Sequence, residues 1–480
     1  MTRDELETLW RDALASPSEE KFHDIARSVI EVYGSDARFR EHIKNRSKRV
    51  TERTGVEFDP DNFDPESAEA FIADEIGFAS WDKLISAVGG SGDTPILFCY
   101  TIAAMERGDF SALESAIGPD RFHDQIMNWF DSGMFESEQE TLDEIFAAAC
   151  MLGYAETSEY LLDKGVDPYG GMKTGLSGFH YAASSGRLNV IELLINRGVR
   201  MEVKNMYGGT VFEQAIWSAI NEHSPDHAAI VEALIQAGAA VDDGYREWWD
   251  KQNVPDAATK KRIAKVLEQH DEFHKRIDDA QRTVANAEAK NDKRLLADSL
   301  KALANILRRL PFLRDKANAV YERAANIYKE IGMPLEEAWV KRHIGINHEY
   351  AERLTEAEKY YHEALALYRE HAAQDDLNYA NAVRYPAVIK NRLGKREESR
   401  ELWEEACRRY ESVHEHGLGE GVAEAAAWLT IFAIEKGDLQ IADEWFAKAG
   451  KASAASDDAD THAFIDGVRT RLEDAHRLAE

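Results

Sequence analysis

The chain has 480 residues, of which 44% are hydrophobic and 30% are charged, with only 11 prolines and 30 glycines. This length and composition exclude a single small module and a disordered chain, and predict several domains or a repeat array. The formal charge of -30 argues against a surface that neutralises nucleic-acid phosphates, and no apolar run is long enough to span a membrane. We therefore expect a cytoplasmic protein that binds neither nucleic acid directly nor a membrane.

Charge is distributed unevenly along the chain. Residues 1–250 carry 21 basic and 46 acidic side chains, whereas residues 251–350 carry 20 basic and 15 acidic ones. The three cysteines, Cys99, Cys150 and Cys407, are too far apart for a zinc motif and are expected to be small buried hydrophobes. Two surfaces of different electrostatic character are therefore predicted.

Residues 1–90 are predicted to form an N-terminal helical region. Apolar residues recur there at three- and four-residue spacing, and Ser16-Pro17 and Asp64-Pro65 each precede a helical stretch. No phosphate-binding GxxxxGK[ST], dinucleotide-binding GxGxxG or nucleophile-elbow GxSxG motif occurs in the sequence. The role of this region is left open.

Residues 91–244 contain a repeated pattern. Gly165, Gly198 and Gly238 each follow a Leu- and Ile-rich segment and are spaced by 33 and 40 residues, and residues 177–180 read SGFH. This pattern resembles the ankyrin repeat, in which T-P-L-H is typical at the start of the first helix. The resemblance implies pairs of short antiparallel helices that bury their apolar faces only against neighbouring repeats.

The ankyrin resemblance implies further details. Each of the three glycines should adopt a left-handed conformation after a second helix, and His180 should hydrogen-bond the turn of a neighbouring repeat. Residues 93–117 look like a degenerate further repeat, and residues 69–88 resemble the N-terminal helical cap of some bacterial ankyrin proteins. Tyr169, Tyr207 and Trp217 are candidate contact anchors, although Trp217 could equally pack between helices.

Residues 245–292 are predicted to form a junction helix. Pro255 suits the first turn of that helix, and no glycine or proline follows it up to residue 290. Within it His270 and His274 lie one helical turn apart, the spacing at which two imidazoles can bind one zinc ion. The adjacent residue is Asp271 where zinc proteases carry Glu, and no third ligand is identifiable, so two solvated histidines are favoured. No metal and no cofactor are expected.

Residues 293–455 carry a longer repeat, which is followed by a predicted capping helix at 456–480. Aromatic residues spaced by 40, 42 and 43 positions are each flanked by small residues, as Ala317, Tyr321, Ala324; Ala357, Tyr361, Ala364; Ser399, Trp403, Ala406; and Ala442, Phe446, Ala449. This resembles the tetratricopeptide repeat in its extended form. In that family the first helix of each repeat lines a concave groove.

The repeat register places candidate binding residues on or near that groove: Arg309, Trp339, Arg342, His343, Asn381, Arg384 and Tyr385. Arg342 and Arg384 occupy equivalent positions in consecutive repeats. Because a guanidinium group binds a carboxylate through two parallel hydrogen bonds, the groove could capture an acidic peptide or a chain's C-terminal carboxylate. Alternatively, both arginines pair with Glu or Asp of adjacent helices.

Together these patterns predict an all-α fold, with an ankyrin-like solenoid followed by a tetratricopeptide-like α-solenoid of bacterial type. The function that fits best is a non-catalytic scaffold or adaptor that binds partner proteins through its repeat surfaces. A ligand-sensing regulatory subunit is the alternative, and a metal-dependent enzyme that uses His270 and His274 is less favoured. The sequence does not indicate the partner or the oligomeric state.

Overall fold

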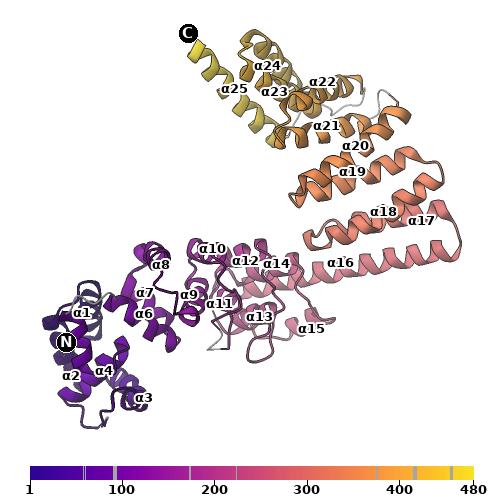
Figure 1. Ribbon diagram of the computed structural model, residues 1–480. Coiled ribbons are helices and arrows are strands. Elements are labelled where there is room, and N and C mark those ends of the chain that lie inside the picture. The colour runs from indigo at the N-terminus through magenta and orange to yellow at the C-terminus, as the bar shows by residue number, and fades with distance from the viewer. Residues whose placement is uncertain are drawn as a thin grey trace. The chain divides into compact units, whose positions relative to one another are not determined.

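The computed structural model describes residues 1–57, 59, 61–89, 95–171, 175–222, 224–373, 377–413, 419–454 and 458–479. Over these ranges the protein is all-α, with no strand, and its helices follow one another as a series of antiparallel pairs (Figure 1). The predicted fold class, an all-α repeat protein, is thus confirmed. The chain forms two compact units, Met1–His270 and Asp271–Glu480.

The first unit begins with a group of five helices: α1 (Arg3–Ala15), α2 (Glu19–Ser35), α3 (Ala37–Thr54), α4 (Pro65–Ile76) and α5 (Trp81–Gly89). Asp64 caps α4 by accepting a hydrogen bond from the backbone N–H of Ser67, as favoured for a carboxylate before a first-turn proline. Ser18 caps α2 by accepting a hydrogen bond from the backbone N–H of Lys21 at 3.3 Å. The apolar faces pack on buried side chains such as Phe22 and Phe71.

Two more helices, α6 (Ile96–Glu106) and α7 (Phe110–Ile117), connect this group to the repeats, and the short η1 (Pro119–Arg121) and α8 (Phe122–Asp131) follow. Three helix pairs come next: α9 (Gln139–Leu152) with α10 (Ala155–Asp163), α11 (Gly178–Ser184) with α12 (Leu188–Asn196), and α13 (Val211–Asn221) with α14 (His227–Ala237). The first helices α9, α11 and α13 pack against one another in sequence, and so do the second helices α10, α12 and α14. This two-layer arrangement is what the ankyrin resemblance implies.

The predicted glycines end the second helices. Gly165, Gly198 and Gly238 have φ angles of 86°, 68° and 101°, a left-handed conformation that costs glycine little because it has no Cβ. His180 is fully buried, and its Nε2 is 3.2 Å from the carbonyl oxygen of Gly209 in the next repeat. The structural role implied for His180 is therefore confirmed.

Residues 245–292, assigned from the sequence to one junction helix, contain two helices: α15 (Tyr245–Asp250) and α16 (Ala257–Ala289). Pro255 does not lie in the first turn of α16, because Asp256 caps that helix and accepts hydrogen bonds from the backbone N–H groups of Ala258 and Thr259. Helix α16 crosses the boundary between the two compact units.

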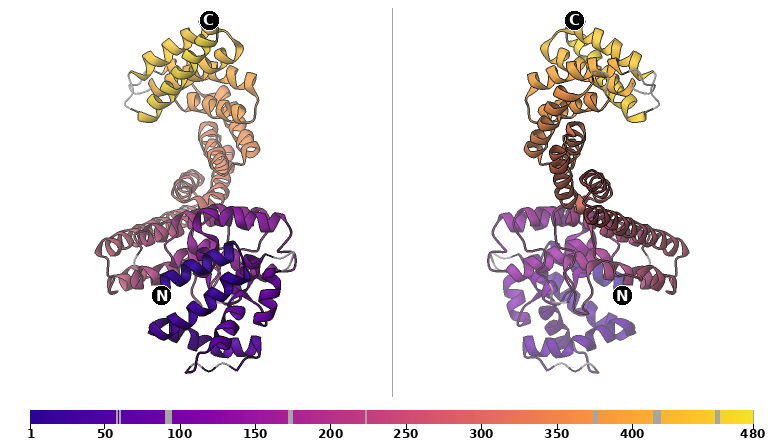
Figure 2. Two further views of the ribbon diagram at one scale, coloured as in Figure 1. Left: turned by 90° about the vertical axis from the view of Figure 1, so that its left-hand side faces the viewer. Right: turned by 90° about the vertical axis from the view of Figure 1, so that its right-hand side faces the viewer.

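The second unit continues as successive helix pairs: α17 (Lys293–Leu307), η2 (Pro311–Leu313), α18 (Arg314–Glu330), α19 (Pro334–Tyr350), α20 (Leu354–His371), α21 (Leu377–Arg392), α22 (Arg396–Ser412), α23 (Gly419–Lys436), α24 (Leu439–Ser453) and the terminal α25 (Ala459–Ala479). Each helix packs on the next one in the chain (Figure 2).

The repeated aromatic residues lie in the core of this unit, where Tyr321, Tyr361 and Trp403 are at most 1% exposed. Small residues let the helices approach these rings. A Cβ added at Gly345 would lie 2.6 Å from the ring of Tyr361, so only glycine fits at that contact. The fourth aromatic residue, Phe446, is half-buried.

Candidate binding surfaces

The turn between α12 and α13 presents Tyr207 to solvent. Asn205 organises the turn, because its side-chain oxygen accepts hydrogen bonds from the backbone N–H groups of Tyr207, at 3.0 Å, and Gly209, at 2.9 Å. The Asn205 amide nitrogen in turn donates to Gln214 on α13 at 3.0 Å. Tyr207 is 83% exposed. The turn therefore presents a large aromatic ring to solvent, while the hydrogen bonds of Asn205 hold the backbone beneath it in place.

Trp217 lies on the first helix of the same repeat, α13, and is 53% exposed. The neighbouring Ile216 and Ala215 face the core. Trp217 therefore does not pack between helices, which was the alternative left open by the sequence. Met206, beside Tyr207, is 62% exposed; sequence reasoning missed it because no periodic pattern marks a residue in a turn.

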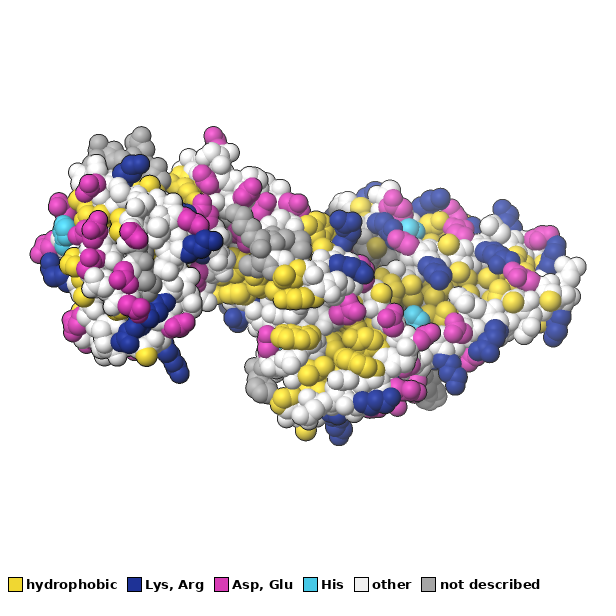
Figure 3. Space-filling model, turned by 90° about the horizontal axis from the view of Figure 1, so that it is seen from below, with side chains coloured by type: hydrophobic (Ala, Val, Ile, Leu, Met, Phe, Trp, Pro, Cys, Tyr) yellow, Lys and Arg dark blue, Asp and Glu magenta, His cyan; other side chains and the backbone are white. Residues whose placement is uncertain are grey.

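Tyr169, the third candidate anchor, is held by contacts within the protein, unlike Tyr207 and Trp217. Its hydroxyl accepts a hydrogen bond from the backbone N–H of Arg200 at 2.7 Å, and the Arg200 guanidinium lies 4.9 Å from the centre of its ring. The ring thus joins two turns of neighbouring repeats. Exposed apolar side chains also occur elsewhere among the described residues, as Figure 3 shows for one face, where they lie between charged groups.

In the second unit the two predicted groove arginines flank one tyrosine. The guanidinium carbons of Arg342 and Arg384 lie 5.9 Å and 5.3 Å from the centre of the Tyr385 ring, and that ring stacks on Tyr361 with a centroid distance of 5.2 Å. The structure therefore brings these two arginines and Tyr385 together. Asn381 on the same helix accepts a hydrogen bond from the Tyr410 hydroxyl at 2.8 Å.

Both arginines already have partners. Arg384 donates Nε and Nη2 to the two carboxylate oxygens of Glu424, at 2.6 Å and 3.1 Å, which is the pairing with an adjacent helix that the sequence left open. Arg342 is 6% exposed and donates to the backbone and side-chain oxygens of Asn378, both at 3.1 Å. A ligand carboxylate would have to exchange with Glu424 to reach Arg384.

Trp339 and His343 form a stacked pair with ring centroids 3.6 Å apart. A carbonyl oxygen can only accept, so His343 donates its Nδ1 proton to the Trp339 carbonyl, at 2.8 Å. Burial lowers the pKa of His343 to about 3, and the ring is thus neutral at physiological pH. Arg309 is exposed just beyond the end of α17, and no ion pair or hydrogen bond of its guanidinium occurs within the described ranges.

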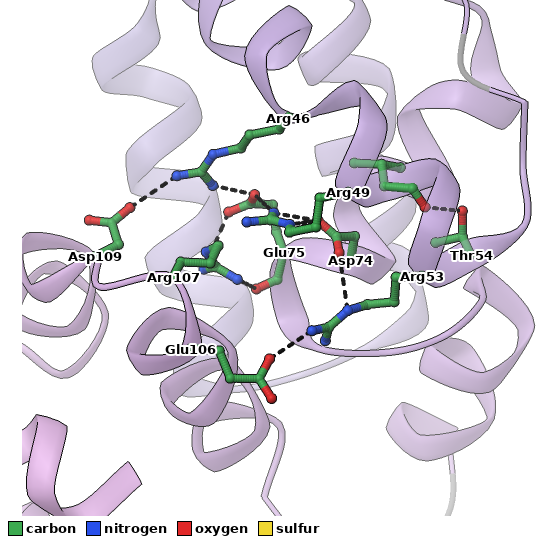
Figure 4. Close-up of polar contacts among 10 residues, drawn as sticks. Arg46, Arg49, Arg53, Thr54, Asp74, Glu75, Glu106, Arg107 and Asp109 are labelled. Atoms are coloured by element: carbon green, nitrogen blue, oxygen red, sulfur yellow. Dashed lines mark hydrogen bonds and ion pairs between the residues drawn. The ribbon is translucent and has the colours of Figure 1, made fainter. Parts of the chain in front are cut away.

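A cluster of ion pairs in the first unit was not identified from the sequence (Figure 4). Three arginines at helical spacing on α3 reach the adjacent carboxylates of Asp74 and Glu75 on α4: Arg46, Arg49 and Arg53. Arg107 joins from the end of α6, where its Nη1 donates to the Glu75 carbonyl at 3.0 Å. The three- and four-residue spacing of these arginines places them on one face of α3, and this spacing is the sequence feature that could have indicated the cluster.

Glu75 is the centre of this cluster and is 7% exposed. Burial by itself raises the pKa of its carboxyl group, but the positive charges of Arg107, Arg46 and Arg49 outweigh that effect and hold the pKa below its ordinary value. The cluster links the N-terminal helices α3 and α4 to α6 and to Asp109 before α7, which bonds Arg46 at 3.3 Å.

His270 and His274 both lie on α16, where His270 is half-buried and His274 is exposed. The portion of the chain that the structure describes holds no group of three or more His, Cys, Asp or Glu side chains arranged to bind a metal ion. Among the described helices, none combines the length and the apolar character that crossing a membrane requires.

Comparison with known proteins identifies one part of the chain. Residues 145–245 match a family model of ankyrin repeats in three copies, which confirms the ankyrin resemblance for that segment. A stretch of 76 residues is 36% identical to the E3 ubiquitin-protein ligase hecd-1 of Caenorhabditis elegans; it covers 16% of this chain and only 3% of that protein.

Two solved structures are similar to parts of the chain at low scores. BtubC from P. vanneervenii is 20% identical with a TM-score of 0.35, over 55% of this chain and 91% of that one. A signal transduction ATPase with numerous domains and a tetratricopeptide repeat sensor, from Pyrococcus horikoshii, is 14% identical with a TM-score of 0.34, over 83% of this chain and 54% of that one.

Proposed function

We propose that this protein is a non-catalytic scaffold or adaptor that binds a partner protein through the ankyrin repeats of its first unit. Ankyrin repeats are in general protein-binding modules, and stacked repeats offer an extended surface on which a few side chains can be varied. The observation that carries the proposal is the exposure of two large aromatic side chains, Tyr207 and Trp217, on one repeat.

The position of Tyr207 and Trp217 supports binding in physical terms. Aromatic side chains supply large contact areas, and tyrosine and tryptophan are enriched among the residues that dominate binding energy. The hydrogen bonds of Asn205 hold the Tyr207 turn in one conformation. Little backbone entropy is therefore lost when a partner covers the turn.

The first test is affinity capture from native lysate, followed by titration of the captured protein in purified form. The test variant carries Tyr207→Ser and Trp217→Ala. The matched control carries Tyr350→Ser and Trp248→Ala, which removes the same residue types from other exposed positions, 64% and 42% exposed. We expect the test variant to bind the partner about thirtyfold more weakly, the effect of losing one hot spot of about 2 kcal/mol.

The control and the wild type should bind the partner equally. The melting temperature of each variant should lie within a few degrees of that of the wild type, because all four substituted side chains are exposed. If the test variant retains the partner as well as the wild type does, the repeat face around Tyr207 and Trp217 is not the binding surface.

A further inference from the structure

A small hollow of about 170 Å³ lies in the second unit. Its lining comes from η2, the first turn of α18 and the turn between α19 and α20: Pro311, Arg314, Asp315, Ala351 and Arg353. Small-molecule sites typically have roughly 300–1,000 Å³, whereas this hollow has room for about six waters at about 30 Å³ each. It therefore suits a single small group, such as a phosphate or a carboxylate, rather than a whole metabolite.

Arg314 brings a positive charge to the hollow without a counter-charge. It is half-buried, and its guanidinium makes no ion pair and no hydrogen bond with any residue that the structure describes. The guanidinium carbon lies 4.7 Å from the centre of the Tyr350 ring. Burial lowers the pKa of Arg314 more than Tyr350 raises it, and the positive charge of Arg308 acts in the same direction as burial. Because arginine nevertheless stays charged, an anion at this position would be stabilised.

Arg353 supplies a second guanidinium to the hollow. Its Nη2 is paired with Asp315, whose side chain is 73% exposed, and its Nη1 has no partner within the described ranges. In Arg314 and Arg353 the only nitrogen atoms that are both buried and unpaired are the two Nε atoms. Nη1 and Nη2 of Arg314 and Nη1 of Arg353 are therefore accessible. Two guanidinium groups from different turns can thus donate to the oxygens of one anion.

The charges around the hollow favour a dianion. Asp315 is the acidic residue of the lining, and it balances Arg353. Glu352, next to Arg353 in the chain, is paired with an arginine of α21 instead. The charges of Arg314 and of the neighbouring Arg308 therefore remain without a carboxylate. A phosphate monoester carries about -1.5 to -2 charges at neutral pH and would balance both, whereas a carboxylate would balance one.

Two exposed aromatic side chains stand next to the lining residues in the chain. Phe312, which follows Pro311, is 43% exposed, and Tyr350, which precedes Ala351, is 64% exposed. A free phosphate ion is too small to cover these rings. The residues on either side of a phosphorylated side chain can pack on them, and aromatic rings supply large contact areas in protein interfaces. The surroundings of the hollow therefore favour a phosphate that is carried on a polypeptide.

We propose that this hollow binds the phosphate group of a phosphorylated serine or threonine in a protein, through the terminal N–H groups of Arg314 and Arg353. The site lies in the second unit and goes beyond the proposed binding by the ankyrin repeats. Its ligand is a protein other than the one that contacts Tyr207 and Trp217. The chain thereby gains a second binding site, which is occupied only when that second protein is phosphorylated.

The test uses fluorescein-labelled pentapeptides on the full chain. Each peptide has glycine at both ends and a central residue between two leucines, and the central residue is phosphoserine, serine or glutamate. Fluorescence anisotropy at low salt measures their affinities, and inorganic phosphate serves as a competitor. We expect the phosphoserine peptide to bind at least about tenfold more tightly than the serine peptide, which corresponds to about 1.4 kcal/mol. The glutamate peptide, with one charge, should lie between them, and inorganic phosphate should bind more weakly than the phosphoserine peptide.

Two variants locate the site. Arg314→Gln removes the unpaired charge and should weaken binding of the phosphoserine peptide about tenfold. Asp315→Asn removes the carboxylate that repels the phosphate and competes for Arg353, and should strengthen binding about threefold. The matched control is Arg323→Gln, which changes the net charge equally at an exposed position of α18 where the arginine is paired with Glu288. This control should bind the peptide as the wild type does.

Three results would overturn the proposal. These are equal binding of the phosphoserine and serine peptides, an equal loss of affinity in Arg314→Gln and Arg323→Gln, and inorganic phosphate that binds as tightly as the phosphoserine peptide, since the hollow would then be a site for a free anion. Circular dichroism establishes that each variant is folded. If Arg314→Gln does not fold, Asp315→Asn decides: unfolding cannot produce a gain in affinity, and unchanged or weaker binding in that variant refutes the site.

Discussion

Arg384 and Glu424, forty residues apart in the chain, form a bidentate ion pair in which Nε and Nη2 of the arginine donate to the two carboxylate oxygens at 2.6 Å and 3.1 Å. Arg384 is one of the two residues that the sequence proposed for capturing an acidic peptide. Glu424 occupies the position that a ligand carboxylate would take. It is therefore an intramolecular competitor for any such ligand.

This pairing leads to a prediction about acidic peptides. Glu424→Gln removes the competing charge, so a fluorescent pentaglutamate peptide should bind this variant about tenfold more tightly than the wild type, which corresponds to about 1.4 kcal/mol. The double variant Glu424→Gln, Arg384→Gln should lose that gain. Glu435→Gln, which removes the exposed partner of Arg396, is the matched control. Fluorescence anisotropy at low salt measures all four, and equal affinities would end the groove hypothesis.

Glu75 is expected to be critical for the stability of the first unit. In Glu75→Gln the arginines around the buried carboxylate lose their shared counter-charge, and breaking a buried pair in this way costs about 3 kcal/mol. Glu7→Gln, which removes an exposed carboxylate paired with Arg3, should cost less than about 1 kcal/mol. Urea unfolding at pH 7 measures both changes.

The pH dependence of Glu75 provides an independent check. Because its folded pKa lies below the ordinary value of 4.5, the unfolded chain takes up the proton first as the pH falls below that value. The stabilisation by Glu75 is therefore fully present above about pH 5 and is lost as the pH falls through the folded pKa. The difference in stability between wild type and Glu75→Gln should shrink in that range, and a constant difference would contradict the assignment.

Two glycine substitutions in the second unit should act in opposite directions. Gly345→Ala places a Cβ 2.6 Å from the ring of Tyr361, whose hydroxyl is held by Glu349 at 2.6 Å, so overpacking should cost about 1–3 kcal/mol. Gly467→Ala lies within α25, where nothing is within 4 Å of the new Cβ, and should stabilise by about 0.5–1 kcal/mol. Urea midpoints compare the two variants; a Gly345→Ala variant that is as stable as the wild type or more stable would mean that the Tyr361 contact is not tight.

His343 should make the second unit less stable in acid. Its pKa is about 3 in the folded chain and about 6.5 in an unfolded one. Between these values only the unfolded state binds the proton, so stability falls by about 1.4 kcal/mol for each unit of pH below 6.5. His343→Gln should lose this contribution. We expect the stability difference between the two proteins to change by about 2 kcal/mol from pH 7 to pH 5, and no change would show that His343 is solvated.

The features that sequence reasoning predicted well are those that repeat. The spacing of the ankyrin repeat predicts where a glycine must follow each second helix, and it also predicts the position of His180. The conformation of these residues depends on local backbone geometry, which the repeat pattern specifies. Trp217 was ambiguous because a tryptophan on an amphipathic helix can face either way. Trp217 is exposed because the neighbouring Ile216 faces the core instead, and the local sequence pattern does not indicate which of the two residues is buried.

The partners of the predicted binding residues could not be read from the sequence. Glu424 is one acidic residue among 88 in the chain, and nothing local to Arg384 selects it. The same holds for the contacts of Arg46 with Glu75 and Asp109, which are 29 and 63 residues distant. Such pairs depend on how helices are packed. Periodicity predicts which helices are neighbours but not which charges meet.

Helix α16 contributes to two hydrophobic cores. Ile263 and Leu267 belong to the core of the first unit, whereas Ile277 and Val284 belong to the core around α17 and α18. A cut after residue 270, where the two compact units divide, would therefore leave each fragment with an incomplete end to its solenoid. A fragment of either unit that is meant to fold alone needs the whole of Ala257–Ala289, and a protease that nicks this helix would weaken both units at once.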